Sequence, residues 1–217
     1  MTTRIFGAGR RLIRAISGGI YSSSSDPTTS ADSTAGYRVG DAWFNTTTGN
    51  VFDAISVAAG AAIWRHRPRV LADSATAVTA PADTAVNTLA TFTLVANTLG
   101  VNGELEIEAI FTVNSNANAK TPRLHFGATN VAGQALASSA GCIERWAFKS
   151  RAASSQIARP AGAGSGGYGA TTAAVSTLAI DTTANVTILI TGQKATAGDT
   201  FTLEGYRIML TRPDIGA

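Results

Sequence analysis

The chain has 217 residues, of which 45% are hydrophobic and only 14% are charged, well below the roughly 25% of an average globular domain. The net charge of +3 is placed unevenly, because residues 1–70 hold eight Arg and four Asp while the remainder is close to neutral. These numbers argue against a long-helix bundle and against a uniformly basic nucleic-acid binder. The single cysteine, Cys142, excludes an intrachain disulfide or cysteine zinc site, and we interpret it as a buried thiol.

Residues 1–20 combine basic and apolar side chains in a stretch that four glycines interrupt. The candidate docking residues in it are Arg4, Ile5, Phe6, Arg10, Arg11, Leu12, Ile13 and Arg14. Because glycine makes an isolated helix marginal, the pattern predicts an arm that orders when it docks on a partner. A membrane-surface helix and a disordered terminus are the alternatives. The stretch lacks the apolar core of a secretion signal, so we expect production in the cytoplasm and no membrane span.

Residues 21–36, YSSSSDPTTSADSTAG, are polar and offer only Tyr21 for burial. Such a composition cannot offset the entropy of ordering, which predicts a flexible or extended connector. We therefore expect three zones along the chain. They are a docking arm with its linker over residues 1–36, a small β-hairpin module over residues 37–70, and a β-sandwich domain over residues 71–217.

Residues 37–70 place Trp43 and Phe44 before a Thr/Gly/Asn turn and Val51 and Phe52 after it, which predicts a β-hairpin. The segment resembles a small module of phage tail fibres and related adhesins, in which a GD-aromatic hairpin is followed by a strand that carries a tryptophan. The matching residues are Gly40, Asp41, Trp43, Asn45, Gly49, Val51, Phe52, Gly60 and Trp64. The last turn of that module is usually polar, whereas here it reads VAAGAAIW, which suggests burial against a neighbour.

From about residue 70 to residue 213 the sequence alternates between apolar and polar side chains in several segments, without a helical stretch between them. This pattern predicts an all-β fold, an antiparallel β-sandwich. In the last segment the alternation changes phase at Gly205, which predicts a glycine bulge. The expected core residues include Leu105, Ile107, Phe111, Ile188, Ile208 and Leu210.

The stretch NGELEIEAIFTVNSNANAKTPRLHFGAT resembles the C-terminal jelly-roll domain of many phage fibre and virion-surface proteins. The matching positions are Gly103, Leu105, Asn114, Asn116, Asn118, Lys120, Leu124, Phe126 and Gly127. The resemblance implies a jelly-roll-like, virion-attached β-structure that forms a homotrimer.

Residues with the spacing of a catalytic or metal site are scarce. His66 lies among arginines, whose field opposes a cation, and His125 reads as a strand residue. Glu104, Glu106 and Glu108 line one strand face and could bind Ca²⁺, although salt bridges to a neighbouring strand are the favoured interpretation. We therefore expect no catalytic residues, no metal and no cofactor.

The glycine-rich segment at residues 162–169 reads as a loop at an edge or tip of the sandwich. Tyr168 in this loop, with Trp146 and Arg151 upstream, forms a candidate contact for a glycan, because aromatic faces stack on sugar rings. Core packing of Trp146 is the competing interpretation.

These observations favour a structural protein of a tailed-phage virion, a short fibre or spike anchored by its N-terminus with the β-domain exposed for host attachment. Its expected partners are copies of itself, tail, collar or capsid proteins bound through the arm, and a host-surface glycan, but no nucleic acid. A capsid decoration or head-fibre protein with a stabilising role is the first alternative. A glycan-degrading tailspike enzyme would require paired carboxylates in a groove, and the sequence shows no such grouping.

Overall fold

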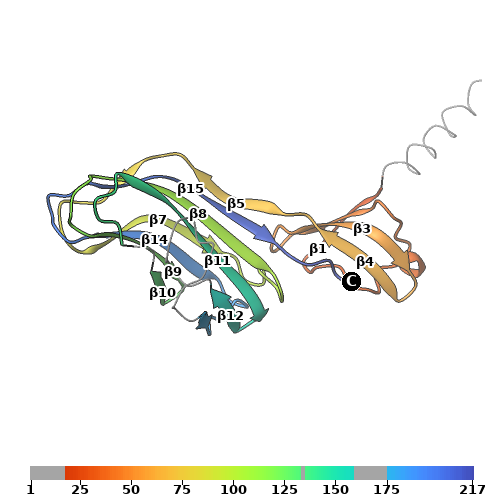
Figure 1. The fold of residues 1–217 in the computed structure, drawn as a ribbon. Coiled ribbons are helices and arrows are strands. Elements are labelled where there is room, and N and C mark those ends of the chain that lie inside the picture. The colour runs from red at the N-terminus through yellow and green to blue at the C-terminus, as the bar shows by residue number, and fades with distance from the viewer. Residues whose placement is uncertain (1–17, 133–134, 159–174) are drawn as a thin grey trace, which may run out of the picture. The chain divides into compact units, whose positions relative to one another are not determined.

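The computed structural model describes residues 18–132, 135–158 and 175–217, and these residues form strands and loops with one short 3₁₀ turn (Figure 1). They divide into two compact units. Unit 1 contains the described residues up to Arg67 together with Arg212–Ala217, and unit 2 contains Pro68–Thr211. The all-β prediction is confirmed. In these described ranges no helix is long and apolar enough to span a membrane.

Unit 1 is a four-stranded sheet of β1 (Ile20–Ser23), β2 (Ala42–Asn45), β3 (Val51–Ala58) and β4 (Ala61–His66), in that order. The hairpin of β2 and β3 pairs Trp43 with Phe52, as predicted. Gly49 and Gly60 follow β2 and β3 with φ of 74° and 70°, a conformation that favours glycine. Strand β1 pairs with β2 in parallel, and η1 (Ser33–Ala35) lies between these two strands in the chain.

The prediction of a flexible or extended connector over residues 21–36 is wrong, because the segment is folded into unit 1. This segment forms β1 and η1, and Ala31 and Asp32 are buried in unit 1. The segment has few apolar side chains, which suggested disorder. Its backbone carbonyls instead accept hydrogen bonds from side chains of unit 1. The Trp43 indole Nε1 donates to Ser25 O at 2.9 Å, and the Trp64 indole Nε1 donates to Ala31 O at 3.0 Å. The segment is thus held by hydrogen bonds to two buried or half-buried rings.

Unit 2 consists of two sheets whose strands all pair antiparallel. One sheet has the order β13-β12-β11-β8-β15-β5, with β6 also paired to β15, and the other has the order β10-β9-β14-β7. The strands are β5 (Arg69–Ser74), β6 (Val78–Thr79), β7 (Val86–Leu94), β8 (Glu104–Val113), β9 (Lys120–Phe126), β10 (Thr129–Ala132), β11 (Gly141–Ala152), β12 (Ser155–Ala158), β13 (Ser176–Leu178), β14 (Val186–Lys194) and β15 (Phe201–Thr211).

The chain of unit 2 passes repeatedly between the two sheets, and early strands become neighbours of late strands. Strand β5 pairs with β15, and β7 pairs with β14 (Figure 1). This nested pairing is the jelly-roll arrangement of a β-sandwich, which agrees with the predicted fold class. The C-terminal residues Arg212–Ala217 differ from the predicted division, because they belong to unit 1 rather than to the sandwich.

The core of the sandwich lies between its two sheets. The six predicted core residues, Leu105, Ile107, Phe111, Ile188, Ile208 and Leu210, are all buried. Phe126 stacks on Phe148 with ring centroids 4.8 Å apart, and Phe111 meets Phe201 edge to face. The register of β15 against β8 shifts between Leu203 and Gly205, which confirms the predicted bulge.

Candidate functional site

The tail-fibre-type motif residues of unit 1 contact the chain segment that precedes β2. The buried Asp41 carboxylate accepts hydrogen bonds from the backbone N–H of Gly19 and, at 2.8 Å, of Arg38. Gly18 lies directly against the motif, since a Cβ there would sit 1.7 Å from the carbonyl oxygen of Gly40. The Gly40–Asp41 pair therefore fixes the backbone just before β1 begins.

Asn45 connects the hairpin turn with two distant segments. Its Oδ1 accepts from Thr47 N at 2.9 Å and closes the turn, while its Nδ2 donates to Asp26 Oδ1 at 2.7 Å. The other oxygen of Asp26 accepts from Arg212 Nη1 at 2.6 Å. Arg212 also lies over the Phe52 ring, 5.6 Å from its centroid. One network thus joins the β1–η1 segment, the hairpin and the C-terminal segment.

Four aromatic rings of unit 1 pack against one another beside its buried core. Tyr37 contacts Tyr21, Trp43 and Trp64 with centroid distances of 4.7, 5.6 and 5.6 Å, and the two tryptophans are 5.7 Å apart. Trp64 is completely buried, and burial raises the pKa of Tyr37. Asp41, Trp43, Asn45, Gly49 and Trp64 therefore build unit 1, and Trp43 and Asn45 also pair with Tyr21 and Ser23 of β1.

The other predicted site residues are placed differently. The docking residues Arg4, Ile5, Phe6, Arg10, Arg11, Leu12, Ile13 and Arg14 lie outside the described residues, as does Tyr168. Trp146 is 2% exposed, so its ring faces are covered by the sandwich core and core packing is the correct interpretation. Arg151 is exposed at the end of β11. The structure therefore leaves Arg151 as the sole member of that glycan group on the described surface.

The Asn-rich turn after β8 surrounds a buried carboxylate. Asp199 Oδ1 accepts from the Nδ2 groups of Asn114, Asn116 and Asn118 at 2.9, 2.6 and 3.4 Å. The fully buried Lys120 donates from Nζ to Asn114 O at 2.7 Å. The Asn114 amide makes the largest contribution to lowering the pKa of Asp199. The three asparagines of the jelly-roll resemblance thus join the turn after β8 to the loop before β15.

The outer face of the larger sheet carries a charged row that the sequence analysis missed. Arg145 on β11, Glu108 on β8, Arg207 on β15 and Asp73 on β5 are successive register partners. Arg145 Nε donates to Glu108 Oε2 at 2.6 Å, which confirms the salt-bridge interpretation for this glutamate. The alternation of β8 showed which face Glu108 occupies, but not which residues lie beside it on the other strands.

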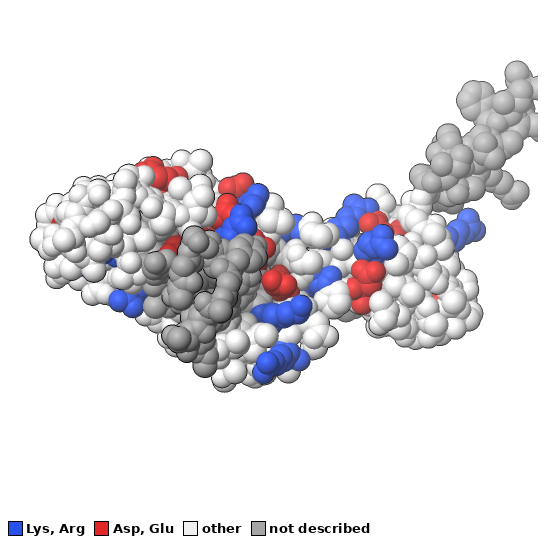
Figure 2. Space-filling model, in the orientation of Figure 1, with Lys and Arg blue, Asp and Glu red and all other residues white. Residues whose placement is uncertain are grey.

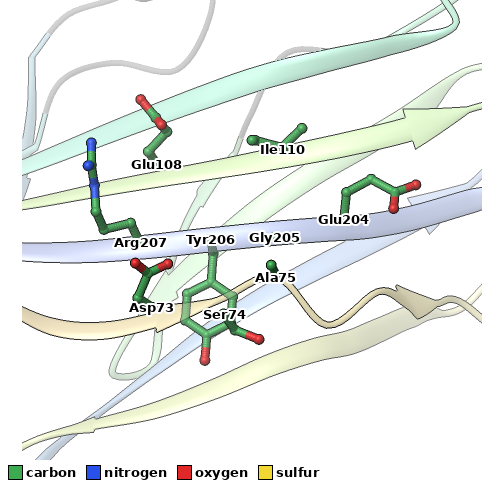
Figure 3. A pocket seen from close by; sticks show the side chains of 9 residues that line it. All are labelled: Asp73, Ser74, Ala75, Glu108, Ile110, Glu204, Gly205, Tyr206 and Arg207. Carbon is green, nitrogen blue, oxygen red and sulfur yellow. The ribbon is translucent and has the colours of Figure 1, made fainter.

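A shallow pocket of about 260 Å³ adjoins this row (Figure 3). It lies where the bulge brings Gly205 opposite Ile110, and Ser74, Ala75 and Glu204 also line it. Among the residues that the structure describes, no group of three or more His, Cys, Asp or Glu side chains has a metal-binding arrangement. On the face that Figure 2 shows, most of the surface of unit 2 carries neither sign of charge.

Cys142 is half-buried on β11 and packs against the sandwich core. Burial, with a smaller contribution from Glu144, raises the pKa of its thiol to about 12. The group is therefore a protonated, unreactive thiol at neutral pH.

No protein-family model matches the sequence, and no curated protein is significantly similar to it. Among the solved structures that are weakly similar to the chain are those of infectious bursal disease virus of the Gt strain and of the Gx strain. The sequence identities are 14% and 15%, and the TM-scores are 0.30 and 0.25. Each similarity covers 69% of this chain but only 34% and 42% of the viral chains, so the chain spans less than half the length of either.

Proposed function

We propose that this chain is a non-enzymatic structural protein of a tailed-phage particle. Residues 1–17 dock on another virion protein, and the β-sandwich is presented to the host surface. The observation that carries this proposal is the convergence of the motif residues of unit 1 on the segment that directly follows the arm. Asp41, Asn45, Trp43 and Trp64 all contact residues between Gly19 and Ala31.

A docking arm transmits force only if the folded part holds the chain at the point where the arm leaves it. Both ends of β1 are secured in this way. Ala42 N donates to Gly19 O at 2.8 Å, and Thr46 N donates to Ser23 O at 2.7 Å. Because the bonds of a parallel ladder are evenly spaced, a pull along β1 is shared among them. The geometry of unit 1 suits an anchor that is loaded from its N-terminal side.

The perturbed carboxylates of the chain support a structural role. Hydrogen bonds lower the pKa of Asp32 to about 2, and the largest contribution comes from the Thr34 hydroxyl, with the next from the backbone N–H of Gly60. The pKa values of Asp181 and Asp199 are also lowered, mainly by the side chains of Thr183 and Asn114. A general acid in glycan hydrolysis needs the opposite shift. These three carboxylates accept local hydrogen bonds and stabilise loops.

A capsid decoration protein is the second candidate. It is favoured by the jelly-roll pairing of unit 2, an architecture that viral capsid and lectin domains share. The two candidates place the arm on different partners, the tail or collar in one case and the capsid in the other. Immunogold labelling of unit 2 on intact particles separates them by position.

The test of the proposed function removes residues 1–17, which leaves Gly18 and Gly19 in contact with unit 1. We expect the shortened protein to keep its melting temperature but to be lost from particles purified on a density gradient. Reversing Arg10 and Arg11 to Glu should reduce incorporation in the same direction, because the side-chain charge of residues 1–17 would fall from +4 to zero. Full incorporation of the shortened protein would contradict the proposal and would move the attachment site to unit 1.

A further inference from the structure

The charged row on the outer face of the larger sheet alternates in sign. Across the strand order β11-β8-β15-β5 its members are Arg145, Glu108, Arg207 and Asp73, so the charges run positive, negative, positive, negative. Figure 3 shows Glu108, Arg207 and Asp73 in succession across β8, β15 and β5. A surface partner of one sign would meet as many repulsive as attractive charges along this row.

A second row lies two residues further along the same face, and its members differ in size rather than in charge. Ile143 and Ile110 are register partners on β11 and β8, with exposed fractions of 57% and 43%. Beside them are Gly205 on β15 and Ala75 just beyond β5, which line the pocket of about 260 Å³. Two large side chains thus occupy one half of the face, and two small residues with a hollow occupy the other half.

Within the described residues of one copy, two charges of the first row have no ion-pair partner, and the two isoleucines of the second row are exposed. Asp73 and Arg207 are exposed, and in the described part of the chain neither forms an ion pair within 4.0 Å. Ile143 and Ile110 lie on adjacent strands in the middle of the sheet, where a solvated face normally carries polar side chains. Adjacent exposed isoleucines beside unpaired charges are typical of a contact surface.

We propose that this face binds the same face of a second copy around a two-fold axis that runs parallel to the strands. Such a rotation reverses the order of each row. Arg145 then faces Asp73 of the second copy, and Glu108 faces Arg207 of the second copy, so all four charges meet an opposite charge. The contact is isologous, since one patch supplies both sides.

The same rotation matches the second row by size. Ile110 faces Gly205 of the second copy and Ile143 faces Ala75, so the isoleucines enter the hollow beside the bulge. Stacked sheets lie about 10 Å apart, a distance that arginine, glutamate and isoleucine side chains span from both sides. Because sheets twist, the match is required only of these two central rows.

The size of the face sets the strength of the contact. Four strands of about ten residues cover roughly 600 Å² per copy from their spacing and rise. This area is below that of a standard protein–protein interface, which predicts a reversible dimer that weakens as salt screens the charged row. The contact replaces the three-fold assembly that the resemblance to fibre proteins implies, and it goes beyond the proposed attachment role.

Charge-reversal variants of the full chain test the proposal by analytical ultracentrifugation from about 1 to about 100 µM. Arg207→Glu places like charges opposite Glu108, and Glu108→Arg places like charges opposite Arg207, so each should weaken dimerisation about tenfold or more. When the two variants are mixed, every facing pair becomes opposite in charge, and we expect dimers to return. The double variant should dimerise for the same reason.

Thr187→Glu provides a control, because it adds a charge to the exposed outer face of the smaller sheet and should leave dimerisation unchanged. Ile143→Lys tests the second row separately and should weaken dimerisation without altering the melting temperature. A wild-type protein that stays monomeric, or whose smallest assembly is a trimer, would overturn the proposal. So would a mixture of the two single variants that remains monomeric while both are folded. Full particle incorporation of the chain that lacks residues 1–17, with wild-type dimerisation intact, would instead count against the proposed function alone.

Discussion

Single carboxylates fix loops in both units by accepting hydrogen bonds from groups that would otherwise lack partners. Asp32 accepts from Thr34 N at 2.8 Å, from the Thr34 hydroxyl at 2.6 Å and from Gly60 N, and so ties η1 to the turn between β3 and β4. Asp199 performs the corresponding role for the Asn-rich turn of unit 2. In a chain with few charges, these buried carboxylates replace part of the missing apolar contacts.

Asp32 makes the stability of unit 1 depend on pH. Its pKa in the folded protein is about 2, against an ordinary value of 3.8, so folding favours the charged form. The stabilisation is complete above about pH 5 and is lost as the pH falls through the folded pKa. Asp32→Asn should therefore lower the urea midpoint of unit 1 at pH 7 and have little effect near pH 2. Tryptophan fluorescence follows this transition, because Trp43 and Trp64 both lie in unit 1.

Asp53→Asn is the matched control for this measurement, since Asp53 pairs with Arg67 at the exposed surface and its removal should change the midpoint little. A difference between Asp32→Asn and the wild type that stayed constant from pH 7 to about pH 2 would contradict the assignment.

At the scale of elements, the sequence predicted strand faces well and strand neighbours poorly. The alternation in β8 and the phase change at Gly205 identified the buried side of two central strands, because period two is a local property of the chain. The hydrogen bonds that hold residues 21–36 come from indoles more than 17 residues away, and the charged row depends on the register of four strands. Neither can be read from a local pattern, since pairing partners are set by long-range contacts.

Phe111 and Thr112 are neighbours on β8 with opposite environments, so alanine substitutions at these two positions test the face assignment. Phe111 is 1% exposed and meets the Phe201 ring at 5.3 Å, whereas Thr112 is exposed. Phe111→Ala should lower the free energy of unfolding by about 3 to 5 kcal/mol through the lost apolar contacts and the remaining cavity. Thr112→Ala should change it by less than about 0.5 kcal/mol. Urea denaturation followed by far-UV circular dichroism measures both, and equal effects would mean that the faces are wrongly assigned.

At the scale of the whole molecule, unit 1 is built from two segments that are distant in the sequence, whereas unit 2 is one continuous segment. The chain leaves unit 1 after Arg67 and returns to it at Arg212, so unit 1 contains both the β1–β4 sheet and the C-terminal segment. Residues 212–217 follow the last strand of the sandwich directly, so the sequence alone predicts that they belong to the sandwich. Their true position depends on contacts with residues more than 140 positions earlier, such as the pairing of Ile215 with Trp64.

This arrangement predicts that the C-terminal segment stabilises the N-terminal unit. Ile215 N donates to Trp64 O at 2.9 Å and Trp64 N donates to Ile215 O at 3.0 Å, while Arg212 binds Asp26 and covers the Phe52 ring. Ending the chain at Thr211 should therefore make unit 1 sensitive to limited proteolysis and lower its melting temperature. Unit 2 should stay resistant, because β15 remains complete and its core is separate.

Arg212→Ala in the full chain should produce a smaller change in the same direction, since the Ile215 pairing is kept. If unit 1 of the shortened chain resisted protease as well as the full protein, β1–β4 would be self-sufficient. The proposed role of the C-terminal segment in stabilising unit 1 would then be disproved.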